Sequence, residues 1–153
     1  MTPEEKIIEL GFQLPAPVAP LASYVPVQRT GNLLHISGQL PMDAEGLRKG
    51  RLGDNVGVEQ AQQAAQICAL NILGQIKSSA GVDLSNIKQV IKLGVFVACT
   101  DDFNEHHLVA NGASDLIGQV LGDKGKHARA AVGVPSLPLG AVVEIEAIVE
   151  IAD

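Results

Sequence analysis

Residues 58–81 read VEQAQQAAQICALNILGQIKSSAG, and residues 89–99, shortly after them, read QVIKLGVFVAC. In the first stretch, apolar residues recur at the three- and four-residue spacing of an amphipathic helix that Gly81 ends. These apolar positions are Val58, Ala61, Ala65, Cys68, Ile72 and Ile76. In the second stretch, apolar residues alternate with others, which is typical of a β-strand. Its apolar face consists of Ile91, Leu93, Val95, Val97 and Cys99. A long helix followed by a long strand predicts a domain in which helices pack on a sheet.

Periodicity and turn residues predict further elements on both sides of this unit. They are strands at residues 24–29 and 33–37 around the turn Thr30-Gly31-Asn32, a glycine-rich loop at 41–57, a helix at 107–121, and strands at 128–134 and 141–151. The last two strands are expected to pair as a hairpin. With a short N-terminal helix, the order is α-ββαβαββ, which predicts an α/β (α+β) fold: a mixed β-sheet with the two long helices packed on one face.

The whole chain, residues 1–153, is predicted to form one domain. Residues 1–21 form an N-terminal extension that opens with a short helix, because Thr2 can cap it, Pro3 suits its first turn and Glu5 completes a capping box. The proline-rich stretch that follows cannot be a central strand or a helix, so it is expected to cross the surface. Its prolines are Pro15, Pro17 and Pro20.

Composition excludes several classes of protein. Hydrophobic residues make up 46% of the chain and charged residues 18%, which predicts an ordered core. The net charge of -6 argues against binding to nucleic acid or an anionic membrane, since both require clustered Lys and Arg. We see no secretory signal or membrane-spanning run, so a cytoplasmic location is expected.

Metal and phosphate sites are not predicted. His106 and His107 are adjacent, so on a helix they point about 100° apart and cannot chelate one ion. We interpret them as a solvent-facing pair at a helix start. Gly125-Lys126 is followed by His127 where a phosphate-binding loop needs Ser or Thr. Of the two cysteines, Cys68 belongs to the apolar face of the long helix, so a small core residue is its expected role.

The two C-terminal strands carry the candidate site. Strand alternation places Arg129, Ala131 and Gly133 on one face, so the guanidinium has small neighbours and room for a ligand. Arginine is also the side chain that grips a carboxylate with two hydrogen bonds. In the last strand, Glu144 and Glu146 share a face. Spacing alone favours glutamates that simply face solvent, and it leaves open whether Arg129 forms a structural ion pair with Glu144 or Glu146.

Four stretches of the chain resemble the reactive-intermediate deaminase family (Rid, also called YjgF). The first two are Tyr24 with Gly31-Asn32, similar to the family's opening strand and turn, and the Ser-Gly-Gln-Leu-Pro segment at residues 37–41. The others are residues 92–97 leading to Asp102-Phe103, and Ala128-Arg129 with residues 143–148 (VEIEAI), similar to the C-terminal signature. The likeness covers residues 22–151.

The resemblance implies a chorismate-mutase-like fold, assembled as a homotrimer with ligand sites in the clefts between subunits. It also implies hydrolysis of a reactive 2-imino or enamino acid to a 2-keto acid and ammonia, without metal or organic cofactor. Carried over by position, Arg129 holds the substrate carboxylate, Glu144 positions or activates the attacking water, and Tyr24 closes one wall and orients that water. The backbone at Ala131 holds the substrate nitrogen. Asn111 and Ser37 match positions near the cleft.

Departures from the family mark a divergent branch. They include the N-terminal extension, Pro26 where many members have Gln, and His127 where many have Pro. His127 lies two residues before Arg129, so it is either a loop residue or a proton donor particular to this branch. A module that only binds a small carboxylate such as a keto acid is the competing function. Ribonuclease activity is the third, and the acidic charge argues against it.

Overall fold

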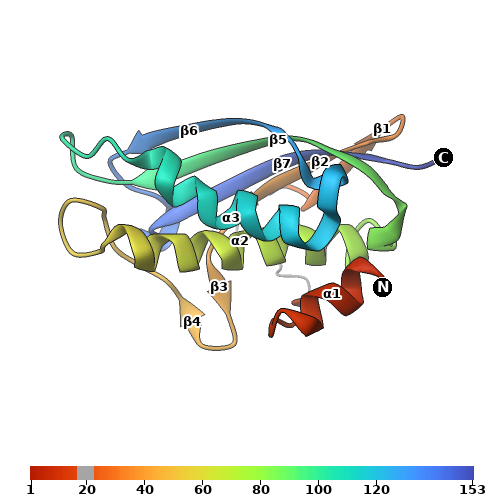
Figure 1. The fold of residues 1–153 in the computed structure, drawn as a ribbon. Coiled ribbons are helices and arrows are strands. Elements are labelled where there is room, and N and C mark those ends of the chain that lie inside the picture. Colours follow the sequence, from red (N-terminus) through yellow and green to blue (C-terminus); the bar gives the residue numbers. More distant parts are fainter. Residues whose placement is uncertain (17–22) are drawn as a thin grey trace.

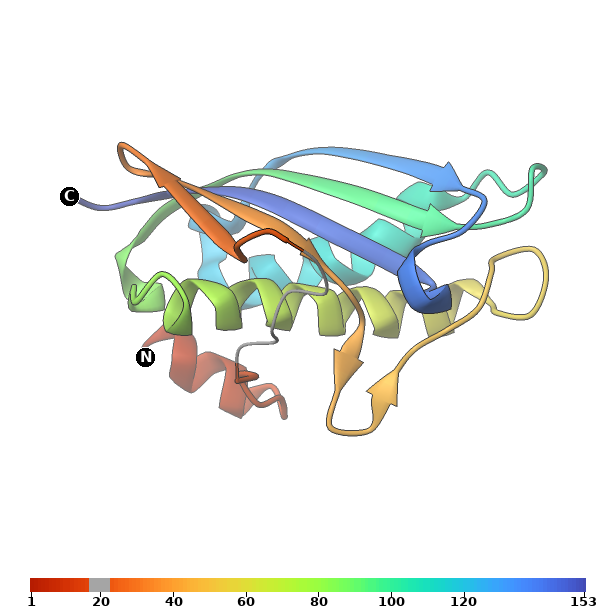
Figure 2. The same cartoon turned by 180° about the vertical axis from the view of Figure 1, so that it is seen from behind.

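A computed structural model describes residues 1–16 and 23–153 of the chain. In this part, five strands form one mixed sheet in the order β1-β2-β7-β5-β6. Their bounds are Val27–Thr30 (β1), Leu33–Gln39 (β2), Ile87–Ala98 (β5), Ala128–Val134 (β6) and Val143–Ile151 (β7). Two long helices, α2 (Val58–Ser78) and α3 (His106–Leu121), lie together on one face of this sheet (Figures 1 and 2). The predicted mixed sheet with both long helices on one face is confirmed.

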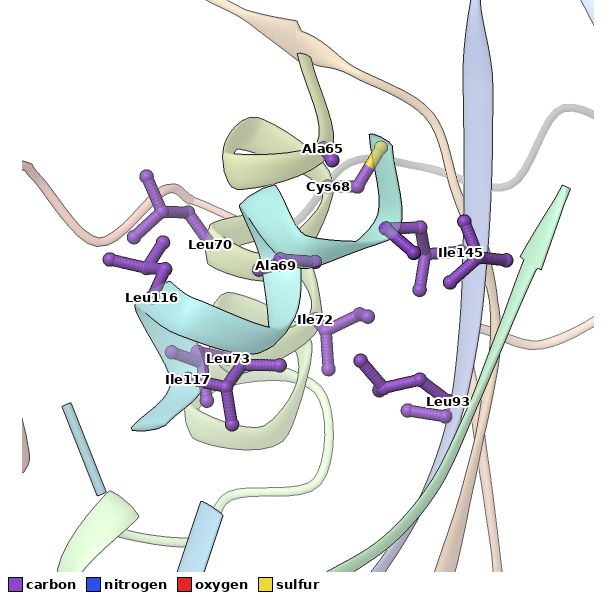
Figure 3. Close-up of a cluster of buried hydrophobic side chains, with 14 of the residues drawn as sticks. Ala65, Cys68, Ala69, Leu70, Ile72, Leu73, Leu93, Leu116, Ile117 and Ile145 are labelled. Carbon is purple, nitrogen blue, oxygen red and sulfur yellow. The ribbon is translucent and has the colours of Figure 1, made fainter. Parts of the chain in front are cut away.

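The core lies between the sheet and these helices (Figure 3). Ile72 of α2 points toward Leu93 of β5 and Ile145 of β7, and Leu73 of α2 and Ile117 of α3 belong to the same buried cluster. Each of these side chains is at most 1% exposed. Burying a side chain of this size stabilises the fold by about 1.5–3 kcal/mol. The apolar spacing of residues 58–76 is therefore the reason that α2 packs on the sheet. Cys68 is fully buried among these residues, as predicted.

The apolar face predicted for the central strand is wrong at its start. The pairing of β5 with β7 shifts between Val90 and Lys92, which marks a β-bulge. The bulge turns Val90 into the core, at 2% exposure, and leaves Ile91 38% exposed. The sequence alternation continues unchanged through this point, so it carries no sign of the bulge.

The predicted C-terminal hairpin is also wrong, because β5 lies between β6 and β7. β6 runs parallel to β5, while β7 is antiparallel to both β5 and β2. The physical reason is the size of the inward-facing side chains. Val143 and Ile145 of β7 are fully buried at the middle of the sheet, whereas Ala131 and Gly133 of β6 have little apolar surface to bury. The strand of small residues therefore lies at the edge.

The N-terminal helix α1 (Pro3–Glu9) has the predicted capping box between Thr2 and Glu5. It lies beside the end of α2, where Glu4 accepts a hydrogen bond from Lys77 at 2.8 Å. Ile7 is fully buried, so the extension is part of the packed domain. Pro15 is half-buried, while Pro17 and Pro20 of the predicted surface crossing lie outside the described residues.

The segment predicted as a loop before α2 contains a two-stranded hairpin. Its strands are β3 (Met42–Asp43) and β4 (Gly46–Leu47). Short 3-10 turns occur at Leu84–Asn86, Gly122–Gly125 and Pro138–Gly140. Among the helices described, none is long and apolar enough to cross a membrane.

Candidate functional site

Arg129 lies on the edge strand β6 with its side chain on the helix-covered face of the sheet. Its Nη1 donates to Oδ1 of Asn111 at 2.9 Å and to Oγ of Ser114 at 3.0 Å, and its Nη2 donates to the carbonyl of His107 at 3.4 Å. These groups are neutral, and α3 presents them one turn apart. A guanidinium has five N–H donors, so some remain for a ligand. In the part of the chain that the structure describes, no carboxylate pairs with Arg129.

Glu144 points to the opposite, open face of the sheet. Its neighbours along β7, Val143 and Ile145, are fully buried against the helices, and strand alternation turns Glu144 away from them. The carboxyl group lies against Gly38, where an added Cβ would come within 2.6 Å of Oε2. Burial, followed by the like charge of Glu146, raises the pKa of Glu144 above its ordinary value. A carboxylate whose pKa is raised accepts a proton more readily than an exposed one.

Ser37 lies next to Gly38, which contacts Glu144, and it is tied to the segment that carries Tyr24. The pairing of β2 with β7 is irregular between Ile36 and Gln39, so Ser37 and Gly38 bulge beside Glu144. Ser37 Oγ donates to the carbonyl of Val25 at 2.7 Å, which ties the segment that carries Tyr24 to this bulge. Tyr24 precedes β1 rather than lying in the predicted opening strand, and it is 47% exposed.

The predicted site residues therefore form two groups. The arginine half-site consists of Arg129, Ala131, Asn111 and Ser114, between β6 and α3. The glutamate half-site consists of Glu144, Ser37, Gly38 and Tyr24, on the open face. Because β5 separates β6 from β7 and the two groups face opposite sides of the sheet, one chain does not bring Arg129 and Glu144 together. A structural ion pair between them within the chain is excluded by the same geometry.

Known proteins are similar to this chain over most of its length. Residues 4–151 match the family described as "YjgF/chorismate_mutase-like, putative endoribonuclease". A Trypanosoma cruzi protein named TCP17 is 49% identical over 93% of this chain and 89% of its own length. The 2-iminobutanoate/2-iminopropanoate deaminase of Capra hircus is 37% identical over 88% of this chain and 82% of its own. The crystal structure of an Agrobacterium tumefaciens protein of unknown function has a TM-score of 0.91 and 54% identity, covering 97% of this chain and 92% of that one.

The chain belongs to the YjgF family. The resemblance inferred from residues 22–151 is thereby confirmed, and the family match reaches back to residue 4, into α1 of the N-terminal extension. The roles assigned to individual YjgF site residues remain predictions. Two contributors were not foreseen. Ser114 was detectable as the residue one turn after Asn111 on the same helix face, but Gly38 depends on a bulge that the sequence does not show.

The interpretation of His106 as solvent-facing is wrong in this YjgF protein, because its side chain contacts Cys99 and Phe103. His106 Nε2 lies 3.5 Å from Sγ of Cys99, and its ring makes an edge contact with Phe103. Gly133 faces this pair, and a Cβ there would lie within 2.6 Å of both groups. Within the described residues, no group of three or more His, Cys, Asp or Glu side chains is arranged to hold a metal ion.

Proposed function

We propose that this protein hydrolyses reactive 2-imino or enamino acids to 2-keto acids and ammonia, without a cofactor. The observation that carries the proposal is the guanidinium of Arg129, held in place by three neutral acceptors of α3 and unpaired with any described carboxylate. A fixed arginine without an acidic partner is a ready receptor for a substrate carboxylate. The 37% identity to a relative named as an imine deaminase supports the same reaction class.

The chemistry needs few groups, because an iminium carbon is already electrophilic. Arg129 would hold the substrate carboxylate, and the backbone at Ala131 would hold the nitrogen. Glu144, whose pKa is raised by burial and by Glu146, would orient a water and take its proton as the oxygen adds to the carbon. Glu144 would then give this proton to the nitrogen of the carbinolamine. The new hydroxyl loses its proton and forms the keto C=O bond as the carbon–nitrogen bond breaks, and the nitrogen leaves as ammonia. Tyr24 would close one wall and help to orient the water.

The two half-sites would come together between copies of the chain. In the described part of the chain no helix covers the open face of the sheet, and Val132 is 48% exposed and Ile91 38% exposed there. The arginine half-site and the glutamate half-site lie on different surfaces, so a contact that joins them is heterologous, and it forms a ring where the rotation between successive copies closes. We propose a homotrimer with one site in each cleft between subunits, as the family resemblance implies.

The test measures ammonia and keto-acid release from imines generated in situ by an amino acid oxidase from alanine or 2-aminobutanoate. We expect the wild-type protein to accelerate release and Arg129→Ala and Glu144→Gln each to abolish the acceleration. Mixing the two inactive variants under conditions that exchange subunits should restore about one quarter of the wild-type rate, since that fraction of clefts combines both intact half-sites. Absence of any recovery would show that the site is not shared between copies.

The same variants separate the competing functions. Binding of 2-oxobutanoate that depends on Arg129, without any rate enhancement on imines, would indicate a module that only binds small carboxylates. RNA cleavage that survives Arg129→Ala and weakens with salt would indicate a ribonuclease.

A further inference from the structure

A recess lined by basic residues adjoins the guanidinium of Arg129. It has a volume of about 320 Å³ and lies at the edge between β6 and the last turns of α3. Its walls are Ser114, Gly118, Gly125, Lys126, His127 and Arg129. Three of these six residues carry basic groups, and no carboxylate of the described residues lines the recess. In a chain with a net charge of -6, this is a local reversal of charge.

His127 is placed to act together with Arg129. His127 directly precedes β6, two positions before Arg129, and both residues line the same recess; two positions of extended chain span about 7 Å. Nδ1 of His127 lies 3.0 Å from the carbonyl of Ala128, so this nitrogen carries the hydrogen that the carbonyl accepts. This hydrogen bond orients the ring, and no described residue forms a hydrogen bond with its Nε2. A protonated imidazole in this orientation can donate Nε2–H to an anion.

The other walls leave room for such an anion. Nothing lies within 4 Å of the position that a Cβ at Gly118 would take. Gly125, in contrast, approaches the carbonyl of Ile117, where a Cβ would come within 2.6 Å, and this close approach brings the following basic residues against α3. Lys126 pairs with Asp123 at 3.2 Å, but both side chains are more than 80% exposed, so this pair is weak and leaves the ammonium available.

We propose that His127, assisted by Lys126, binds a second carboxylate of a substrate whose first carboxylate is held by Arg129. The separation of His127 and Arg129, about 7 Å along the backbone, suits a dicarboxylic acid of four or five carbons. The substrate class is therefore a 2-imino acid with an acidic side chain, such as the imine of glutamate or aspartate. The catalytic part of this inference rests on the proposed deaminase function, whereas its binding part does not.

Direct binding measurements test the recess independently of catalysis. Isothermal titration should show that 2-oxoglutarate binds at least about tenfold more tightly than 2-oxobutanoate, because the second carboxylate makes a charge-assisted hydrogen bond. His127→Leu should remove this difference without changing the affinity for 2-oxobutanoate, and His127→Lys should restore part of it. Equal affinities for both keto acids in the wild-type protein, or a preference that survives His127→Leu, would overturn the proposal.

Turnover of matched imines then separates this proposal from the proposed function. The imines of glutamate and glutamine differ in charge but hardly in size, and we expect a preference of about tenfold or more in kcat/KM for the acidic one. The preference should vanish in His127→Leu, because that variant lacks the donor to the second carboxylate. Hydrolysis of both imines at equal rates would refute the proposed binding of a second carboxylate and would support the deaminase function. If neither imine is hydrolysed while 2-oxoglutarate still binds through His127, the deaminase function is refuted and the second carboxylate site is supported.

Discussion

Replacing Gly38 by alanine should disable the glutamate half-site and leave the fold intact. A Cβ built at Gly38 lies 2.6 Å from Oε2 of Glu144 and 2.9 Å from its Cδ. Ordinary van der Waals contact begins near 3.4 Å, so the nearest carboxyl oxygen must retreat by about 0.8 Å. The displaced atoms form the end of a flexible side chain, and Gly38 does not have a positive φ. We therefore expect the free energy of unfolding to change by no more than about 1 kcal/mol.

The expected effect on catalysis is much larger. A displacement of about 1 Å of a positioned group costs on the order of 100-fold in rate. For Gly38→Ala we expect kcat/KM for the imine of alanine to fall by about 10- to 100-fold, which corresponds to about 1.4–2.7 kcal/mol of lost transition-state stabilisation. Denaturant unfolding of the same preparation supplies the stability value. Keto-acid binding to Arg129 should weaken far less than turnover, since the arginine half-site is untouched.

Gly57→Ala is the matched control, because Gly57 precedes α2 with φ of -90° and nothing lies within 4 Å of its added Cβ. It should retain wild-type turnover. The reasoning about Glu144 is refuted if Gly38→Ala keeps kcat/KM within twofold of the wild-type value while folding normally. A loss of more than about 3 kcal/mol of stability would refute the assumption that only the side chain moves.

Three other predictions follow from the same geometry. The raised pKa of Glu144 means that its carboxylate is protonated at a higher pH than that of an ordinary glutamate, so turnover should fall on acidification through a pKa above the usual glutamate value. Glu146→Gln should move this limb of the pH–rate profile to lower pH, whereas an unmoved limb would assign it to another group. Ile7→Ala removes a fully buried side chain of α1 and should lower the free energy of unfolding by about 2–5 kcal/mol in a denaturant titration, whereas a change under 0.5 kcal/mol would show that the extension is not docked. Val132→Asp places a charge on the exposed apolar part of the open face, and light scattering should show smaller assemblies than for the wild-type protein; an unchanged mass would place the interface elsewhere.

Much of the candidate site was predictable because its signals are local. Strand alternation correctly placed Arg129 among small neighbours on one face of its strand, and Glu144 and Glu146 together on another. The motif resemblance added Tyr24, Ser37 and Asn111. None of these signals says which strands are neighbours, because alternation describes one strand at a time. The hairpin expected for the last two strands was therefore wrong, although both strands were located correctly.

The sequence by itself determined the long helix that begins at Val58 and ends before Gly81, the burial of Cys68, the capping box at Thr2 and the family. These depend on residue types at short spacings, which the chain displays directly. Only the tertiary structure decided the insertion of β5 between β6 and β7, and with it the separation of Arg129 from Glu144. Strand order follows from which faces bury the most apolar area across the whole sheet, a quantity that involves residues far apart in the chain. That separation turns a site expected within one hairpin into two half-sites, which a single chain leaves on opposite faces of its sheet.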